Sequence, residues 1–397
     1  MTFASRFARR AAALFVCACA AGLAAAADEA APRPAWTWDG IYKADLLHIS
    51  EPSGTSAVGN LGLRWNADAG ALLGWDDTTL HAELLWNHGG KPNRRIGTTQ
   101  GVSNLEVAQN AARLYATWIE HEFKATGGTG VLFGLYDLNS EFYATDASGL
   151  LIHPSFGIGI DFSQSGRNGP SIFPNLGLAL RVKQPLGGGY YAQAAVIDGV
   201  PGDPANPGRT VIRLSRDDGA LLVGEAGWQE RGDDGPKSGH WGVGAWHYTA
   251  RSGRIDGNGA PAHNQGAYAL AQGALIDREA GSTLGFVRVG VADRQLNGVE
   301  LAIGTGVQVE RPFGEQGPAA FTAGVAYARY SRAQRDAIDP PAASHETAIE
   351  IGARWLPAPR LALQPLAQRV LNVGGRAGHH ATLLGVRAEW SFGDAAP

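Results

Sequence analysis

The fold is decided by the stretch Gly298-Val-Glu-Leu-Ala-Ile-Gly-Thr-Gly-Val-Gln-Val-Glu310. Its odd-numbered positions from Val299 to Val309 are apolar apart from one threonine, and its even-numbered positions are polar or small. Successive side chains of a β-strand point to opposite faces, so this alternation predicts a strand with one apolar and one polar face. The stretch from Ala381 to Phe392 repeats the pattern with Leu384, Val386 and Trp390 on its apolar side.

Segments of this kind recur along the whole chain, and we count sixteen of them. They lie at 38–48, 58–67, 79–87, 111–122, 130–137, 172–182, 189–198, 219–229, 239–250, 265–276, 282–293, 299–310, 319–330, 345–356, 360–372 and 381–392. A tilted strand crosses a bilayer with about 9–11 residues, which most of these segments approach or exceed. No apolar run after residue 27 approaches the roughly 20 residues of a membrane-spanning helix.

The connections between the segments alternate in length. Long gaps follow odd-numbered segments, at 88–110, 138–171, 199–218, 251–264 and 331–344, and most gaps after even-numbered segments are short. The gaps 294–298 and 68–78 depart from this rule. Short turns on one side and long loops on the other are typical of outer-membrane barrels. An even number of strands also places both ends of the barrel on the same side.

The position of the aromatic residues favours a membrane barrel over a soluble β protein. The apolar face carries mostly single Val, Leu and Ala residues, and aromatic residues flank them near the segment ends. These are Trp36, Trp38, Trp65, Trp86, Tyr190, Trp228, Phe321, Trp355 and Trp390. Such residues form the girdles at the two membrane interfaces of a barrel. We therefore predict an all-β fold: a transmembrane antiparallel β-barrel of about 16 strands, apolar toward lipid and polar toward a water-filled lumen.

The beginning of the chain resembles a secretory signal peptide. Arg6, Arg9 and Arg10 precede an Ala-rich apolar run, and the sequence turns acidic at Asp28. We predict cleavage after Ala27, which makes residues 1–27 the signal peptide and 28–397 a single barrel domain. Cleavage before one of the two cysteines, as in a lipoprotein, is the alternative. Cleavage after Ala27 removes both cysteines, so a disulfide framework or a thiol nucleophile is not expected.

The last predicted strand and the net charge indicate which partners to expect. Leu384 to Phe392 resembles the final strand that the barrel-insertion machinery reads, although five residues follow Phe392. The formal net charge is −4 without a basic run, which argues against nucleic acid as a partner. We expect an integral protein of a Gram-negative-type outer membrane, in contact with its lipid, as a homotrimer or a monomer.

A family resemblance is carried by a series of ordered motifs between residues 101 and 203. They are Gly101-Val-Ser-Asn-Leu-Glu106, Arg113-Leu-Tyr115, Trp118-Ile-Glu120, Phe133-Gly-Leu-Tyr-Asp-Leu-Asn-Ser-Glu-Phe142, Phe156-Gly-Ile-Gly159, Asp161-Phe-Ser-Gln-Ser-Gly-Arg-Asn-Gly-Pro-Ser-Ile-Phe-Pro174 and Ala195-Val-Ile-Asp-Gly-Val-Pro-Gly-Asp203. Together they resemble the carbohydrate-selective porins of the OprB type, and the resemblance extends more weakly to the C-terminal half. It implies a sixteen-stranded barrel that admits monosaccharides and related small sugars, with an external loop folded inward to narrow the pore.

The longest gap, 138–171, predicts the same inward-folded loop from its composition. It is rich in Gly, Asn and Ser but contains Leu151, Ile152, Phe156, Ile158 and Phe162. A solvated external loop has little reason to carry so many large apolar residues, whereas a loop packed on the inside of the wall does. Loops of this length in compact domains are usually functional. A loop that caps the barrel from outside is the alternative.

The alternation of faces and the family motifs select the candidate pore residues. Those that we expect to line the pore or bind sugar are Arg64, Glu83, Arg113, Tyr115, Asp137, Asn139, Glu141, Asp161, Arg167 and Arg181. Further residues expected in the lumen are Lys43, Asp45, Gln193, Glu225, Arg288, Glu300, Glu350, Arg354, Arg387 and Glu389. Trp118 has the opposite parity to Tyr115 and is expected to face lipid.

Mixed charges suit a neutral solute. A ring of one sign selects ions, whereas a mixed lining offers donors and acceptors to sugar hydroxyls, and the Tyr115 ring offers a stacking surface. The alternative is that these charges only pair across strands and solvate the lumen. Arg167 and Asp161 have an alternative role as well, in which they brace the loop through a salt bridge.

The sequence predicts a channel without catalytic residues, cofactor or metal. His379-His380 and His345-Glu346 are adjacent pairs, which in a strand point to opposite faces and cannot share a metal ion. Carboxylates are present but none has the context of a glycosidase pair, and no serine is placed to act with a histidine. The hypothesis is passive, selective diffusion of small carbohydrates of the glucose type into the periplasm. The alternatives are a general porin for small hydrophilic solutes or a barrel with an occluded lumen, and, from another class, a hydrolase embedded in the barrel.

Overall fold

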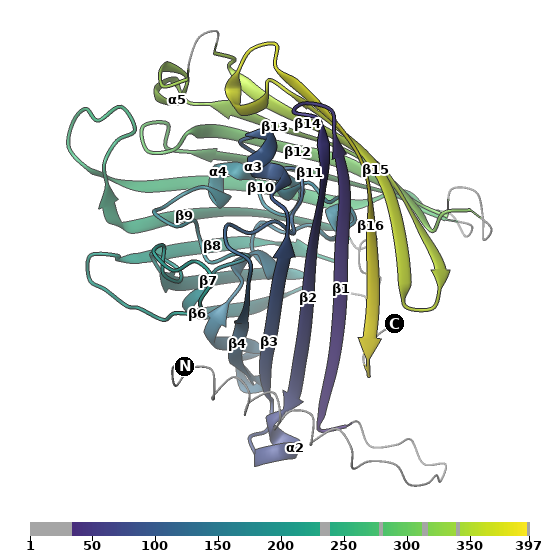
Figure 1. Ribbon diagram of the computed structural model, residues 1–397. Helices are drawn as coiled ribbons and strands as arrows, with labels where there is room; N and C mark the ends of the chain where they lie inside the picture. Colours follow the sequence, from purple (N-terminus) through teal and green to yellow (C-terminus); the bar gives the residue numbers. More distant parts are fainter. Residues whose placement is uncertain (1–33, 231–238, 278–280, 312–316, 339–341, 395–397) are drawn as a thin grey trace, which may run out of the picture. The chain divides into compact units, whose positions relative to one another are not determined.

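The computed structural model describes residues 34–230, 239–277, 281–311, 317–338 and 342–394. Sixteen antiparallel strands among them form one closed barrel, in which each strand pairs with its neighbours in sequence (Figure 1). Strand β1 (Trp36–Ile49) pairs with β16 (His380–Gly393) and closes the sheet. The barrel and its loops belong to one compact unit that begins at Ala35. The predicted signal peptide and its cleavage site lie outside the described residues.

All sixteen predicted strands are confirmed. The remaining ones are β2 (Gly54–Asp68), β3 (Thr78–Gly89), β4 (Ala111–Phe123), β5 (Thr129–Tyr136), β6 (Gly177–Gly187), β7 (Tyr190–Asp198), β8 (Ala220–Gln229), β9 (His240–Ser252), β10 (Ala262–Ile276), β11 (Thr283–Ala292), β12 (Val299–Glu310), β13 (Ala320–Tyr330), β14 (His345–Ala358) and β15 (Leu361–Leu371). One boundary is clearly wrong, because β6 begins at Gly177 and not at residue 172. Ile172 and Asn175 instead pair with each other within the preceding loop.

The helices are short additions to this sheet. They are α2 (Ala69–Leu73), α3 (Pro92–Ile96), α4 (Ile160–Ser163) and α5 (Arg332–Asp336). In the part of the chain that the structure describes, none of the helices has the length and hydropathy to cross a membrane.

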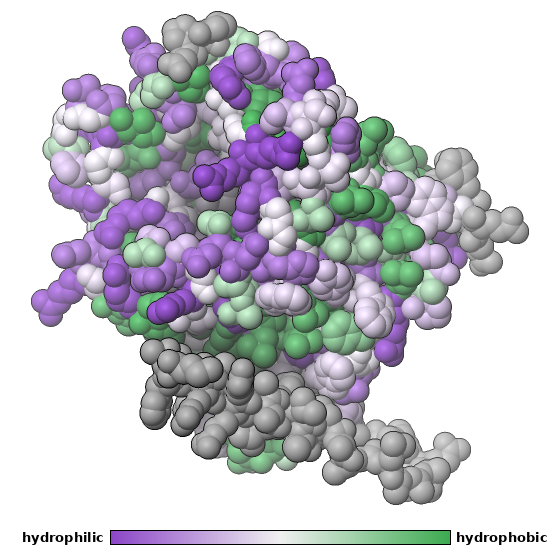
Figure 2. Space-filling view, viewed as in Figure 1, coloured by the Kyte–Doolittle hydropathy of each residue, from purple (hydrophilic) through white to green (hydrophobic). Residues whose placement is uncertain are grey.

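The two faces of the barrel wall differ as the alternation predicts. Large apolar side chains such as Leu46, Val287 and Ile351 are exposed on the outer wall. Polar and charged side chains of the same strands, such as Asp45 and Arg288, are buried on the inside. Figure 2 shows apolar residues over much of the outer wall and hydrophilic residues gathered over the loops. This distribution is that of a barrel with lipid outside and a polar interior.

Eight of the nine aromatic residues expected to flank the apolar band lie at one rim. This is the rim where the first strand begins, the last strand ends and the short turns lie. Trp36, Tyr190 and Phe321 lie at or next to the first residue of strands that start there. Trp228, Trp355 and Trp390 lie near the ends of strands that finish at the same rim. Among the nine, Trp86 alone lies toward the rim with the long loops. The sequence pattern had suggested girdles at both ends.

One expectation about a face is wrong, at Trp118. The register between β3 and β4 shifts between Ala82 and Leu84, so strict alternation fails along β4. Trp118 stacks on His81 at 4.7 Å between ring centroids and shares its face with Glu120. Glu120 forms an ion pair with the interior residue Arg181, so Trp118 faces the lumen and not lipid.

A second expectation about a face is wrong for the same reason: Glu300 faces outward and not into the lumen. The pairing of β12 with β13 shifts between Val299 and Leu301. Glu300 forms an ion pair of 2.8 Å with Arg329, an exposed residue that is paired in register with the outward-facing Leu301. Val299, expected outside, is buried inside against Tyr330. A bulge adds one residue to one strand, which moves the following side chains to the opposite face.

Candidate functional site: a channel mouth between two inserted loops

The β5–β6 loop (residues 137–176) is folded into the barrel, as predicted. Leu151, Ile152 and Phe156 are buried in a cluster with side chains from the inner wall. Phe162 stacks on Trp246 of β9, with the ring centroids 4.8 Å apart and the planes nearly parallel. The apolar residues of the gap thus pack on the wall from inside, which rules out a loop that caps the barrel externally.

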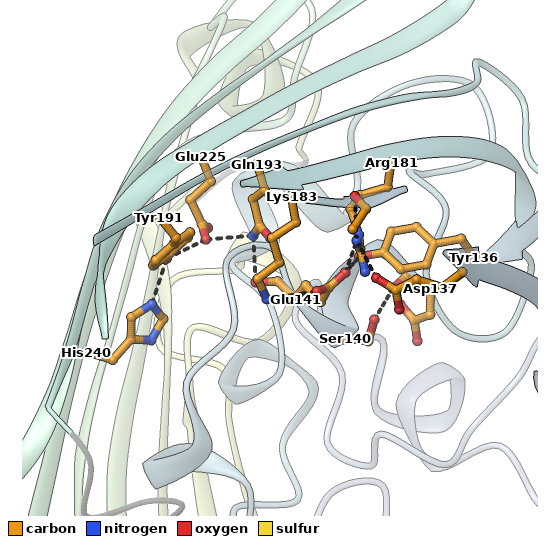
Figure 3. Close-up of polar contacts among 12 residues, drawn as sticks. Tyr136, Asp137, Ser140, Glu141, Arg181, Lys183, Tyr191, Gln193, Glu225 and His240 are labelled. Carbon is orange, nitrogen blue, oxygen red and sulfur yellow. Dashed lines mark hydrogen bonds and ion pairs between the residues drawn. The ribbon is translucent and has the colours of Figure 1, made fainter. Parts of the chain in front are cut away.

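Polar side chains of the inner wall hold this loop in place. The Arg288 guanidinium donates to the carbonyl oxygens of Tyr143 (3.3 Å), Ser155 (3.0 Å) and Gly157 (2.5 Å). Glu225 accepts a hydrogen bond from the Tyr143 backbone N–H at 2.9 Å. The same carboxylate accepts from two tyrosine hydroxyls and the Gln193 amide, part of which Figure 3 shows. Two residues expected to line the lumen are therefore covered by the loop that they bind.

Glu141 and Arg181 form the centre of an ion-pair network at the start of the loop (Figure 3). Arg181 contacts Glu141 at 2.7 Å and Glu120 at 2.8 Å, and Lys183 contacts Glu141 at 2.9 Å. Burial opposes ionisation of Glu141, but Lys183 and Arg181 outweigh it and lower the pKa of this carboxyl group. Arg181 is buried among these carboxylates, so its guanidinium is occupied by the protein itself.

Arg113 and Arg167 both join the β5–β6 loop to the segment 199–219 that connects β7 and β8. Arg113 donates to the carbonyl oxygens of Pro174 (3.2 Å) and Pro207 (2.9 Å). Arg167 forms a 3.0 Å ion pair with Asp218. The bracing role considered for Arg167 is therefore observed, but its partner is Asp218 and not Asp161.

Asp137 and Asn139 shape the turn where the loop leaves β5. The Tyr115 hydroxyl donates to Asp137 at 2.5 Å, and Asp137 also accepts from the Asn139 backbone N–H at 2.9 Å. Burial raises the pKa of Asp137. Tyr115 is buried and forms a T-shaped contact with Phe173, and of these two residues Phe173 lines the cavity described below.

Asp161 is buried at the start of α4, away from the open part of the lumen. Its Oδ1 lies 3.4 Å from the Tyr143 hydroxyl, and its Oδ2 has no hydrogen-bond partner among the described residues. Burial raises the pKa of this carboxyl group to about 7. Asp161 does not contact the cavity described below.

The wall of β1, β2, β14 and β16 carries charges that remain partly exposed inside the barrel. Arg64 pairs with Asp39 at 2.5 Å, and its side chain is 41% exposed. Lys43 pairs with Glu389 at 3.7 Å, and its side chain is 35% exposed. Glu83 on β3 is the register partner of Arg64. Charges of both signs therefore face this part of the lumen, mostly as pairs.

A cavity of about 500 Å³ lies between the β5–β6 loop and the β3–β4 loop (residues 90–110), and we call it the mouth cavity. Its lining residues are Asn93, Thr98, Thr99, Gln100, Gly101, Ser103, Asn104, Glu106, Asp137, Asn139, Pro154, Ser155, Gly157, Ile158, Ile160, Ser163, Gln164, Ile172 and Phe173. These are amides, hydroxyls, a few apolar groups and two carboxylates, and none of them is a cation. Only Asp137 and Asn139 of the ten predicted site residues belong to this set.

Sequence reasoning missed most of the mouth cavity. Phe173 and Gln164 lie within the family motifs, which is the one signal that could have singled them out. The residues from Thr98 to Gln100 lie in a gap without periodicity, so no pattern marked them. Among the described residues no group of three or more His, Cys, Asp and Glu side chains is placed to hold a metal ion.

A closed sixteen-stranded barrel with an apolar outer wall and loops folded into a polar lumen defines a porin, a channel protein of the outer membrane. The family of carbohydrate-selective porins, OprB family, matches residues 53–392, and the chain belongs to it. No curated protein matches.

Solved structures agree with this fold. The high-pH structure of Pseudomonas putida OprB has a TM-score of 0.76 at 18% identity, over 90% of this chain and 94% of that one. The anion-selective porin from Comamonas acidovorans has a TM-score of 0.55 at 14% identity, over 90% and 99%. The outer-membrane channel DcaP of Acinetobacter baumannii has a TM-score of 0.56 at 10% identity, over 90% and 97%. At these identities the likeness is one of fold, and family and fold together indicate a channel.

Proposed function

We propose that this porin lets small neutral carbohydrates of the glucose type diffuse passively and selectively across the outer membrane. The composition of the mouth cavity carries this proposal. Asn, Gln, Ser and Thr side chains both donate and accept hydrogen bonds, as sugar hydroxyls do. Of the residues that line the cavity, Glu106 and Asp137 are the only ionisable ones, and both are acids.

The apolar part of the mouth cavity supports a sugar ring in particular. Phe173, Ile172 and Ile158 of the β5–β6 loop line the same cavity as the amides and hydroxyls of the β3–β4 loop. Binding sites for small molecules combine apolar walls with a few placed polar groups. A pyranose has C–H faces and a rim of hydroxyls, which fits such a lining. A few hydrogen bonds and apolar contacts bind a sugar weakly enough for it to be released again, as conduction requires.

A general porin for small hydrophilic solutes is the second candidate. The ion pairs of Arg64 with Asp39 and of Lys43 with Glu389 favour it, since a lumen with both signs of charge does not single out one class of solute.

Solute flux separates these two candidates. Purified protein is placed in a planar bilayer, and the single-channel conductance is titrated with glucose, while liposome swelling compares glucose with gluconate, an anion of similar size. We expect saturable block of the current by glucose and swelling several-fold faster with glucose than with gluconate. Absence of block, with the two solutes entering at equal rates, would establish the general porin instead.

A matched pair of variants tests the mouth cavity itself. Phe173→Leu removes the ring from the mouth cavity, and Phe321→Leu removes one from the outer wall. We expect the first variant to weaken glucose block by about 10-fold, which corresponds to about 1.4 kcal/mol, and the second to leave it unchanged.

A further inference from the structure

Strand β14 carries two glutamates, Glu346 and Glu350, four residues apart on its inner face. Residues separated by an even number share one face of a strand. Both side chains are fully buried. Each accepts hydrogen bonds from a different inserted loop.

Glu346 binds the β3–β4 loop. Its carboxylate accepts from the backbone N–H groups of Thr99 (3.0 Å) and Gln100 (2.8 Å) and from the Thr98 hydroxyl (2.7 Å). It also accepts from the Gly374 N–H at 2.6 Å, in the loop that follows β15. The Gln100 side-chain amide donates to the backbone carbonyl of Glu346 at 3.1 Å. One carboxylate thus collects four donors from two loops, which satisfies backbone groups that would otherwise be buried without partners.

Glu350 binds the β5–β6 loop in the same manner. It accepts from the backbone N–H groups of Ile152 (2.8 Å) and His153 (2.9 Å). The Gln368 amide of β15 donates to Glu350 at 2.9 Å and to the Val102 carbonyl of the other loop at 2.9 Å. The side chains of β14 and β15 therefore hold both loops against one side of the barrel.

The two loops are also bonded to each other. The Asn104 N–H donates to the Ile152 carbonyl at 3.0 Å, and the Gln164 amide donates to the Thr99 carbonyl at 2.7 Å. Ser155 donates to the Gln100 side chain at 3.1 Å. Thr99, Gln100, Asn104, Ser155 and Gln164 all line the mouth cavity. Thr99 and Gln100, which bond to Glu346, therefore line the mouth cavity, and Asn104 joins this lining to Ile152, which bonds to Glu350.

We propose that Glu346 and Glu350 are positioning residues that set the size limit of the channel by holding both loops on β14. The carboxylates do not meet the solute. Replacing a carboxylate by an amide turns one acceptor oxygen into a donor that faces backbone N–H groups, so the loop loses part of its hydrogen bonds to that side chain and is held less firmly. The strand pairing that forms the barrel does not involve these side chains.

The experiment compares Glu346→Gln, Glu350→Gln and the double variant with wild type. The control is Glu300→Gln, a strand glutamate whose carboxylate pairs with Arg329 and not with a loop. Heat-dependent electrophoretic mobility first establishes that each barrel is folded. Single-channel conductance and liposome swelling with mono-, di- and trisaccharides then give the size limit.

We expect each Gln variant to raise conductance about twofold or more and to admit the trisaccharide, with the largest effect in the double variant and none in Glu300→Gln. A folded variant with the wild-type size limit overturns the proposal, whether its conductance is unchanged or lower, because the loops are then held without the carboxylates. If the Gln variants do not fold, Thr98→Val removes one hydrogen bond to Glu346, and Gln368→Leu removes one to Glu350 together with the bond to the Val102 carbonyl. We expect a smaller increase in conductance from these two variants. A wild-type size limit in both would also overturn the proposal.

This result is independent of sugar preference. If the Gln variants widen the channel while glucose fails to block the wild-type channel, the positioning role is supported and the proposed function is contradicted. Glucose block of the wild-type channel with an unaltered size limit in the Gln variants means the reverse.

Discussion

At the scale of residues, the inner-wall side chains differ in what they contact. Arg288 and Glu225 are turned into the lumen by the alternation of β11 and β8, but the β5–β6 loop covers them and uses their hydrogen bonds. Lys43 of β1 and Arg64 of β2 instead have side chains that stay partly exposed, at 35% and 41%. A charge on the polar face of a strand can therefore either bind an inserted loop or stay exposed in the lumen.

Asp161 makes a residue-scale prediction about pH. Burial raises the pKa of this carboxyl group from the ordinary value of an aspartate to about 7, so the folded loop binds this proton more tightly than an unfolded loop does. The protonated Asp161 therefore stabilises the folded loop at low pH, and this stabilisation is lost as the pH rises from about 4 to about 7. The full change is on the order of a few kcal/mol for a shift of this size. Arg288 and Tyr143 face the same carboxyl group and reduce this shift.

Amide hydrogen exchange of residues 143–162 at pH 5 and pH 8 measures this effect. We expect protection to fall at the higher pH in wild type, and to change little between the two in Asp161→Asn after correction for intrinsic exchange. Asp203→Asn, at an exposed loop position, is the control. Equal pH dependence in wild type and Asp161→Asn would contradict the prediction.

At the scale of elements, the β5–β6 loop has one side that packs on the wall through apolar residues and another that lines the mouth cavity with polar and apolar residues. Residues 149–157 supply Leu151, Ile152 and Phe156 to the wall contact, and Pro154 and Ser155 to the mouth cavity. Strand bulges act at this scale too, since the shifts in β4 and β12 move Trp118 inside and Glu300 outside.

Deleting residues 149–157 should enlarge the conductance, because this segment occupies lumen space and no strand pairing depends on it. Planar-bilayer recording measures the change, and we expect an increase of about twofold. Deleting residues 203–206, in the exposed part of the β7–β8 connection, should leave conductance within about a fifth of wild type. An equal or smaller conductance after the first deletion would mean that this segment does not limit passage.

At the scale of the whole molecule, the barrel closes where its first and last strands pair. Arg387 of β16 forms two hydrogen bonds with Asp45 of β1, at 2.6 and 2.8 Å, and both side chains are buried. Asn104 accepts a further bond from Arg387 at 2.6 Å, which links the closure to the β3–β4 loop. The contact joins positions 342 residues apart, so it forms only when the whole sheet has assembled.

Arg387→Leu should destabilise the closed barrel. It leaves the Asp45 carboxylate buried without its cation, a loss that typically costs about 3–5 kcal/mol. We expect a lower urea midpoint for unfolding in detergent, followed by tryptophan fluorescence and by heat-dependent mobility. Arg369→Leu is the control, because Arg369 is exposed and its guanidinium donates to the Thr382 hydroxyl and not to a carboxylate. An equal midpoint for the two variants would show that the Asp45 pair does not stabilise the closure.

The amino-acid sequence by itself determined the number of strands, their approximate limits, the polarity of the two faces and the inward position of the longest loop. Each of these follows from a local property: a period of two within a segment, or the share of apolar residues within a gap. This is why segments as far apart as 38–48 and 381–392 could be assigned separately and correctly.

Only the tertiary structure decided which polar residues face the lumen freely and which hold a loop. Glu346 and Thr98 are 248 positions apart, and no local pattern connects them. The faces of Trp118 and Glu300 likewise depend on bulges, which arise from pairing with a neighbouring strand and not from the alternation itself. A residue's face is a local property, but its hydrogen-bond partners depend on how the whole chain closes on itself, and the mouth cavity is made of such partners.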